Sequence, residues 1–467
     1  MNVIIISALF GVLMMFSSVF YTKAKSYLPI ALLGFVALLV VAILDFNTID
    51  LFKVQADTML RFSRFSYLFN ILITGCAIMY LLLSGADVEK VGSSRAEYFA
   101  LLFFIFCGIY IVASFSNLLM LFIGIEIISI PLYILASSDK RNLKSNEAGL
   151  KYFLMGAFST GIMLLGIAFL YGSLGSFNIN EVQVAVETRT AANGIAYALP
   201  KAWTVVGMML LFASMAFKVS VAPFHFWTPD VYDGSPTVFT SFMATIVKAS
   251  VFIAFISLFH TMFGVLQYKW LQFASIATAL TLIIGNITAV FQQSVKRMLA
   301  YSSIAQAGFM MFAVMVLGEK AYHGMLLYTV SYCLATVGIF AVLLRLKDYT
   351  FDGFNGLAKT QPVLAGTVTI FLLSLAGIPL TAGFFAKYYM LSAAITGGIY
   401  MWLIILAILC AAVSVYYYFR VIQAMYFKEG TPQVEDSNTS FKFTLIVTAL
   451  LVLLIGIMPS VITSWLE

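Results

Sequence analysis

Long apolar stretches, separated by short polar ones, run along the whole sequence. A run of about 20 apolar residues is the length that crosses the hydrocarbon core of a bilayer as a helix, whereas a membrane β-barrel would show shorter, alternating segments. We therefore predict an all-α polytopic membrane protein with about 14 transmembrane helices. The predicted spans are residues 3–21, 27–44, 66–84, 97–114, 117–137, 150–172, 203–226, 236–260, 270–291, 299–317, 322–344, 363–395, 400–427 and 442–462.

The composition agrees with this pattern, because 62% of the 467 residues are hydrophobic and only 10% are charged. Soluble domains carry roughly a quarter charged residues. No basic residue precedes the first apolar run, and Lys23 and Lys25 follow it. We expect this run to be a true span and not a cleaved signal peptide.

The basic residues predict an orientation. Of those in loops or near span ends, 16 fall on the side of the first loop and 7 on the other. Since cytoplasmic loops carry the excess of lysine and arginine, the N- and C-termini are predicted outside, on the periplasmic face. The net charge of +6 then reflects topology and gives no reason to expect nucleic-acid binding.

Three lysines and one acid fall inside predicted spans: Lys218, Lys248, Lys387 and Glu126. Each charge at mid-membrane costs about 2.5–3.5 kcal/mol on insertion scales, so such residues usually serve a function. One interpretation is that some lie near a span end and extend to the interface. The more specific one is a hydrated, proton-exchanging path. Opposite charges about 4 Å apart attract by about 4 kcal/mol at an effective dielectric near 20, so Glu126 could hold a lysine protonated.

Two spans contain helix-breaking residues. Pro223 interrupts the segment of Lys218, and Gly377, Pro379 and Gly383 interrupt the segment of Lys387. Proline removes a backbone donor and clashes with the preceding turn. Broken helices at mid-membrane are common where transporters bind ions, although an ordinary proline kink is the alternative.

Four segments carry a resemblance to a known family: "GIEIISIPLYIL", "EAGLKYFLMGAFSTGIMLLGIAFLYG", "MAFKVSVAPFHFWTPDVYDGSPTVFTSFMATIVKASVF" and "GIPLTAGFFAKYYML". They resemble the antiporter-like membrane subunits of respiratory complex I over nearly the whole chain. The resemblance implies two inverted five-helix repeats, each with one broken helix. The implied divisions are residues 1–96 for helices 1–3, 97–260 for helices 4–8, 261–427 for helices 9–13 and 428–467 for helix 14.

Carried over to this sequence, the resemblance assigns proton-transfer roles to the buried charges. It makes Glu126 the ion-pair partner of Lys218, the central proton carrier. Lys248 becomes the link to the second half-channel, and Lys387 the terminal site on the second broken helix.

Two further residues match the family. Lys151 corresponds to a lysine at the start of helix 6, and His225 resembles a relay between Lys218 and Lys248, although a histidine at a helix break is as often only a hydrogen-bonding residue.

The resemblance also implies the function and the partners. It implies a proton-translocating subunit of NADH:quinone oxidoreductase in the bacterial inner membrane, beside subunits M, K, J and their neighbours, and lipids. FMN, iron–sulfur clusters and quinone would belong to other subunits. The cysteines and histidines show no metal-ligand spacing, so neither a metal nor a cofactor is expected in this chain. A free-standing multisubunit sodium/proton antiporter remains the alternative, and a metabolite permease is a weaker one.

Overall fold

A computed structural model describes residues 1–20, 26–49, 51–52, 58–184 and 202–464. These residues form helices joined by short loops, with isolated β-bridges only. The helices are α1 (Asn2–Phe20), α2 (Leu28–Phe46), α3 (Arg64–Val88), α4 (Arg95–Ser114), α5 (Leu118–Ala136), α6 (Leu143–Leu174), α8 (Ala202–Lys218), α9 (Trp227–Gly234), α10 (Thr237–Phe242), η1 (Met243–Val247), α11 (Lys248–Phe263), η2 (Gly264–Leu266), α12 (Gln267–Val290), α13 (Val295–Met315), α14 (Glu319–Leu343), η3 (Asp352–Phe354), α15 (Leu357–Thr360), α16 (Pro362–Ala376), α17 (Ala382–Thr396), α18 (Met401–Phe427), α19 (Thr439–Ile457) and α20 (Ser460–Thr463).

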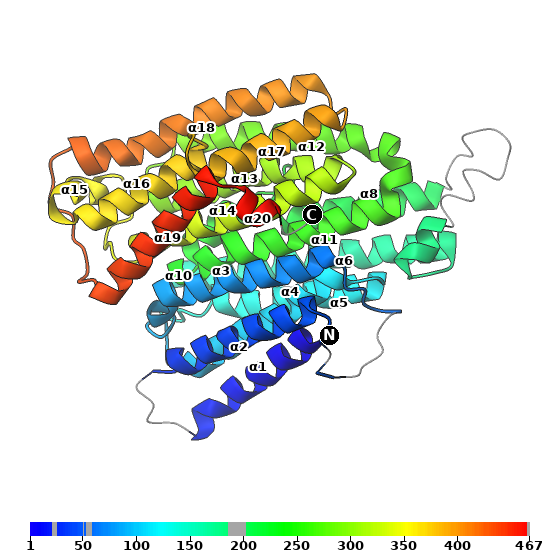
Figure 1. The fold of residues 1–467 in the computed structure, drawn as a ribbon, viewed down its shortest axis with the longest axis horizontal. Helices are drawn as coiled ribbons and strands as arrows, with labels where there is room; N and C mark the ends of the chain where they lie inside the picture. The colour runs from blue at the N-terminus through cyan, green and yellow to red at the C-terminus, as the bar shows by residue number, and fades with distance from the viewer. Residues whose placement is uncertain (21–25, 50, 53–57, 185–201, 465–467) are drawn as a thin grey trace.

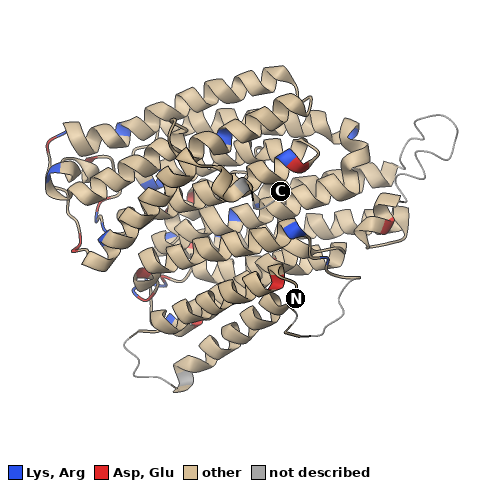
Figure 2. Ribbon diagram, viewed as in Figure 1, with Lys and Arg blue, Asp and Glu red and all other residues tan. Residues whose placement is uncertain are grey.

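The long helices lie side by side along the long axis of the molecule (Figure 1). In that view α1 and α2 form one edge and α18 the opposite edge, while α14 lies in the interior. Large apolar side chains on the outer helices, such as Phe158 of α6 and Leu409 of α18, are exposed, as expected where lipid replaces water. Charged residues are sparse along the helices and gather mainly in loops and at helix ends (Figure 2).

The predicted all-α membrane fold is confirmed, and a helical segment coincides with each predicted span. By length and composition, ten described helices could cross a membrane, or eleven if one bent pair is a single span. The number of crossings, 14, therefore stays a prediction. The orientation count used five basic residues that lie outside the described residues: Lys23, Lys25, Lys53, Arg189 and Lys201.

Both predicted helix breaks are present. The first separates α8, which ends at Lys218, from α9, which begins at Trp227. The second separates α16 from α17, where Gly377 adopts a left-handed conformation (φ +84°) that ends α16. Gly383 packs so closely on the carbonyl of Ser374 that a Cβ atom would lie 1.9 Å from its oxygen. The two halves of the second broken helix are therefore held tightly together.

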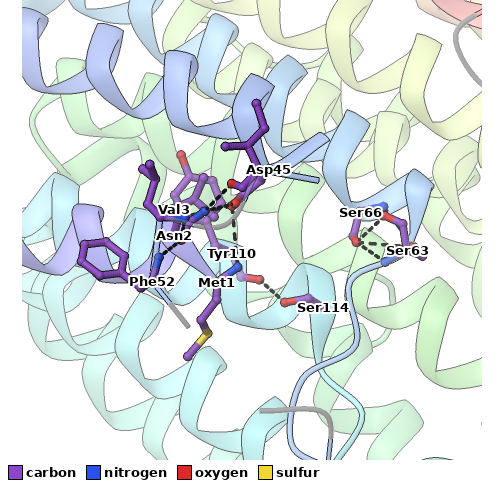
Figure 3. Close-up of polar contacts among 11 residues, drawn as sticks. Met1, Asn2, Val3, Asp45, Phe52, Ser63, Ser66, Tyr110 and Ser114 are labelled. Carbon is purple, nitrogen blue, oxygen red and sulfur yellow. Dashed lines mark hydrogen bonds and ion pairs between the residues drawn. The ribbon is translucent and has the colours of Figure 1, made fainter. Parts of the chain in front are cut away.

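Glu126 is the one acid inside a predicted span, but two acids just beyond span ends, in the last turns of helices, are buried as well. Asp45 of α2 is 4% exposed and accepts hydrogen bonds from Asn2 Nδ2 (2.5 Å) and the backbone N–H of Val3 (3.3 Å; Figure 3). Asp87 of α3 is 5% exposed and pairs with Arg345, which follows α14, at 2.6 Å. Contacts between segments far apart in the sequence bury these helix ends.

Candidate functional site

Lys218 lies at the first helix break, as the last residue of α8. Its Nζ donates to Ser129 Oγ at 3.0 Å, Thr160 Oγ1 at 3.3 Å and Tyr133 Oη at 3.4 Å. The negative end of a helix dipole favours a cation at this position. The ammonium group is thus held by three neutral hydroxyls from α5 and α6.

The direct ion pair expected between Glu126 and Lys218 is not formed. No salt bridge joins them in the described part of the chain, and Glu126 Oε1 is buried there without a hydrogen-bond partner. The physical reason is that the ammonium lies against Ser129, about one turn beyond Glu126 on the same face of α5. The spacing of the sequence placed both residues in the bundle but could not specify which group the flexible lysine contacts.

Lys248 is buried, with 2% exposure, at the start of α11. Its Nζ donates to both the backbone oxygen and Oγ of Ser303 on α13, each at 3.0 Å, and lies 5.7 Å from the ring centre of Tyr232. The preceding turn, Met243–Val247, is a π-helix. Such turns often occur at functional sites, and this one sets the direction in which Lys248 leaves its helix.

Lys387 of α17 contacts the second helix break. Its Nζ donates to the carbonyls of Leu375 (2.8 Å) and Ala376 (3.0 Å), the last two residues of α16, and lies 4.9 Å from the ring centre of Phe309. Lys387 therefore caps the C-terminal end of α16, where the helix dipole and the free carbonyls favour a cation.

Both broken helices have a lysine at the break, although the spacing between lysine and proline differs. Lys218 precedes its proline and ends the first half-helix itself, whereas Lys387 follows its proline and reaches back to the end of α16. Within the described residues, only the Lys387 ammonium bonds the free carbonyls that end a first half-helix, whereas the Lys218 ammonium bonds hydroxyls of α5 and α6. Broken helices of this kind are common where transporters bind ions.

Lys151 lies apart from these lysines, in a charged cluster between α6, α9 and α13. It pairs with Glu147 (2.7 Å) and Asp230 (3.1 Å), and Arg297 pairs with Asp230 (3.1 Å) and Asp233 (3.7 Å). The cluster surrounds an open cavity of about 250 Å³. Burial alone would raise the pKa of Asp230, but hydrogen bonds from Lys151 and Arg297 outweigh it and lower that pKa.

His225 lies in the loop between α8 and α9. Its Nδ1 is buried without a hydrogen-bond partner, and within the described residues its side chain bonds neither Lys218 nor Lys248. His225 therefore contacts neither lysine directly, and its role as a relay between them stays a prediction.

Lys296 is a buried lysine that the sequence did not distinguish. It was counted as a loop charge, but it is 5% exposed and donates to the carbonyls of Asp233 (2.8 Å) and Ser235 (2.7 Å) at the end of α9. A polar cavity of about 450 Å³ opens beside it. Lys296 and Arg297 are adjacent at the start of α13, as basic residues at the membrane–water interface often are. The sequence therefore gives no sign that Lys296 is buried.

Gln306 of α13 connects the neighbourhoods of Lys248 and Lys387. It lies one turn beyond Ser303, and its Nε2 donates at 3.1 Å to the Leu375 carbonyl, which Lys387 also contacts. The hydroxyl of Tyr328 donates to its Oε1. A small cavity of about 10 Å³ adjoins Lys387, close to the minimum volume for one water molecule. This polar contact was not predicted, because a glutamine within an apolar span carries no charge that the search for buried ions would detect.

No group of three or more histidine, cysteine or acidic side chains that could hold a metal ion occurs among the residues described. The site consists of lysines, hydroxyls and carbonyls. Such an arrangement can bind, hold and exchange protons.

Known proteins are similar to this chain in both sequence and fold. A family model described as NADH:quinone oxidoreductase/Mrp antiporter, transmembrane, matches residues 115–414. NADH-quinone oxidoreductase subunit N of Flavobacterium psychrophilum is 35% identical, with 100% of each chain covered. Subunit N of Cytophaga hutchinsonii is 38% identical over 99% of this chain and 98% of the relative. A chain of respiratory complex I from Thermus thermophilus, solved with bound aureothin, superposes with a TM-score of 0.81 at 29% identity, covering 99% of this chain and 98% of that one.

Proposed function

The chain belongs to the NADH:quinone oxidoreductase/Mrp antiporter family of membrane proteins, and we propose that it acts as subunit N of NADH-quinone oxidoreductase. In this role it is a membrane subunit of a translocase and moves protons, driven by redox chemistry on other subunits. FMN, the iron–sulfur clusters and quinone belong to those other subunits. Its partners are further subunits of the complex, and we propose M, K and J among them.

One observation carries the proton-transfer role. Lys218, Lys248 and Lys387 each place an ammonium group inside the bundle, where hydroxyls and carbonyls of the described residues accept its hydrogen bonds. A carboxylate partner would hold each proton by charge attraction, and losing the proton would leave a buried anion behind. Lys248 and Lys387 can become neutral without that penalty, and for Lys218, which Glu126 attracts without forming an ion pair, the penalty is reduced.

We propose that protons pass from the Lys218 half of the bundle to the Lys387 half through Lys248. The contact of Lys248 with Ser303, and the carbonyl that Gln306 and Lys387 share, support the second part of this route. Water is needed to complete it. The two halves correspond to the proposed inverted repeats, residues 97–260 and 261–427, and the basic-residue count supports termini on the periplasmic side of a bacterial inner membrane.

A second role, as part of a free-standing sodium/proton antiporter, is compatible with the family, since its description includes such proteins. Sequence identity of 35–38% to subunit N proteins, over 99–100% of this chain, favours the oxidoreductase. Purification of the native assembly separates the two: we expect flavin- and iron–sulfur-containing partners. A flavin-free assembly with sodium-stimulated proton flux would instead establish the antiporter.

The proton-carrier role is tested with Lys218→Arg. Arginine keeps a cation but has a pKa above about 12, so it hardly ever releases its proton. NADH-driven proton uptake by inverted membrane vesicles, normalised to assembled complex, should fall nearly as far as in Lys218→Ala. Normal uptake with arginine would show that Lys218 is only a fixed charge.

A further inference from the structure

We propose that the hydroxyls of Ser129, Tyr133 and Thr160 form a second docking position for the Lys218 ammonium, which competes with Glu126 for it. We call these three residues the hydroxyl cradle. The inference rests on the proposed proton-carrier role of Lys218 and adds three positioning residues to it.

The cradle is a built, buried site. Ser129, Tyr133 and Thr160 are 4%, 8% and 6% exposed, and their oxygens lie 3.0–3.4 Å from Lys218 Nζ. Thr160 Oγ1 donates its own proton to the Gly156 carbonyl at 2.9 Å, so its oxygen is directed to accept from the lysine. An ammonium group has three protons to donate, and the cradle supplies an acceptor for each.

Glu126 provides the competing position. It lies three residues before Ser129 and seven before Tyr133, a spacing that places all three on one face of α5. Its Oε1 is buried and accepts no hydrogen bond within the described residues. A buried acceptor without a donor is unfavourable, especially when charged, which favours a second arrangement in which a donor reaches it. Three residues span about 4.5 Å of helix, a distance that the flexible four-carbon stem of Lys218 can cover.

The two positions have opposite consequences for the proton. Beside Glu126, charge attraction keeps Lys218 protonated. In the cradle the ammonium group makes no direct ion pair, and Glu126 attracts it only from beyond contact distance. It can therefore give a proton to a water molecule more readily and become an amine, whose single lone pair accepts a hydrogen bond from Ser129 or Tyr133. Movement between the two positions therefore converts Lys218 from a proton-holding to a proton-releasing group.

α6 offers a way to disturb the cradle without removing any of its hydroxyl groups. A Cβ on Gly156 would lie 2.1 Å from Tyr133 Oη and 2.6 Å from its Cζ, so Gly156→Ala must displace the tyrosine side chain. A Cβ on Gly161, in the same helix, would meet nothing within 4 Å. Gly161→Ala is therefore a matched control for the effect of alanine on α6.

The test compares Ser129→Ala, Tyr133→Phe and Gly156→Ala with Gly161→Ala in the complete complex. NADH-driven proton uptake per assembled complex is measured across a range of pH. Loss of one hydrogen bond to a charged group should lower uptake about tenfold in the first three variants. Because Lys218 then stays beside Glu126, the alkaline limit of the pH profile should move to higher pH. Gly161→Ala should match the wild type.

The competition is tested by repeating Tyr133→Phe in a Glu126→Gln background. Without the competing carboxylate, the pH profile should no longer respond to Tyr133→Phe. An equal shift in both backgrounds, or a wild-type profile in all cradle variants, would overturn the proposal. Lys218→Arg distinguishes this failure from failure of the proposed function: if arginine abolishes uptake while the cradle variants behave as wild type, only the cradle is rejected.

Discussion

The close packing of Gly383 on α16 predicts that a single methyl group will disable the second broken helix. Gly383→Ala would place its Cβ 1.9 Å from the Ser374 carbonyl oxygen, whereas real Cβ contacts are essentially never below 3.0 Å. The start of α17 must therefore move away from α16 by about 1 Å. Lys387 lies one turn further along α17, so its ammonium moves with the helix.

The size of the effect follows from the hydrogen bonds of Lys387. Its distances of 2.8 and 3.0 Å to the Leu375 and Ala376 carbonyls would lengthen beyond the usual limit of about 3.2 Å. Each hydrogen bond from a charged group contributes about 1.5–3 kcal/mol, so losing both costs about 3–6 kcal/mol. The flexible lysine stem recovers part of this, and we expect proton uptake to fall at least about tenfold, equivalent to about 1.4 kcal/mol.

The assay is NADH-driven proton uptake by inverted membrane vesicles, divided by the amount of assembled complex. Gly366→Ala is the matched control, because it adds the same methyl group to α16 where nothing lies within 4 Å. It should assemble and pump as the wild type does. Wild-type uptake by fully assembled Gly383→Ala would refute the link between the helix break and the position of Lys387.

Three further predictions follow from the buried charges. Lys296→Met should reduce the amount of assembled complex on native gels, because two carbonyls at the end of α9 lose their hydrogen-bond donor, and Lys296→Arg should restore that amount. A Lys296→Arg complex that assembles normally but does not pump would instead indicate that Lys296 transfers protons. Asp87→Asn should lower the melting temperature of the solubilised complex, because breaking a buried ion pair costs about 3–5 kcal/mol, and adding Arg345→Met should recover part of the loss. Lys387→Glu should take up fewer protons per NADH than the wild type but more than Lys387→Met, because a neutral carboxyl can donate to one α16 carbonyl and still exchange a proton. An equal loss of proton uptake in the two variants would show that no titratable group is needed at this site.

The fold could be predicted from the sequence because each span is apolar over the thickness of a bilayer, a local property of the chain. The same property revealed Lys218, Lys248 and Lys387, since a charge stands out within an apolar run. The broken helices were visible through Pro223 and Gly377, whose backbone constraints act locally.

The features that could not be predicted from the sequence depend on contacts between distant segments. Lys296 and Asp87 stand near helix ends, where solvent is the usual neighbour, and only the packing of α9 and Arg345 against them shows that they are buried. The contact of Lys218 with hydroxyls, and not directly with Glu126, has a similar origin, because the choice between a carboxylate and three hydroxyls depends on the positions of α5, α6 and α8. Spacing along the chain does not determine that choice.

The π-helical turn before Lys248 gives this helix a place where its length can change by one residue. A π-turn closes one rotation with one residue more than an α-turn, so the extra residue is accommodated within a wider turn. Deleting one residue of Met243–Val247 would restore regular α-helical winding and leave Lys248 facing nearly the same direction relative to α10. Single-residue deletions should therefore be tolerated better in this turn than in the regular helix that follows it. In an alignment with a distant relative that lacks the turn, the gap belongs inside this helix and not in a neighbouring loop.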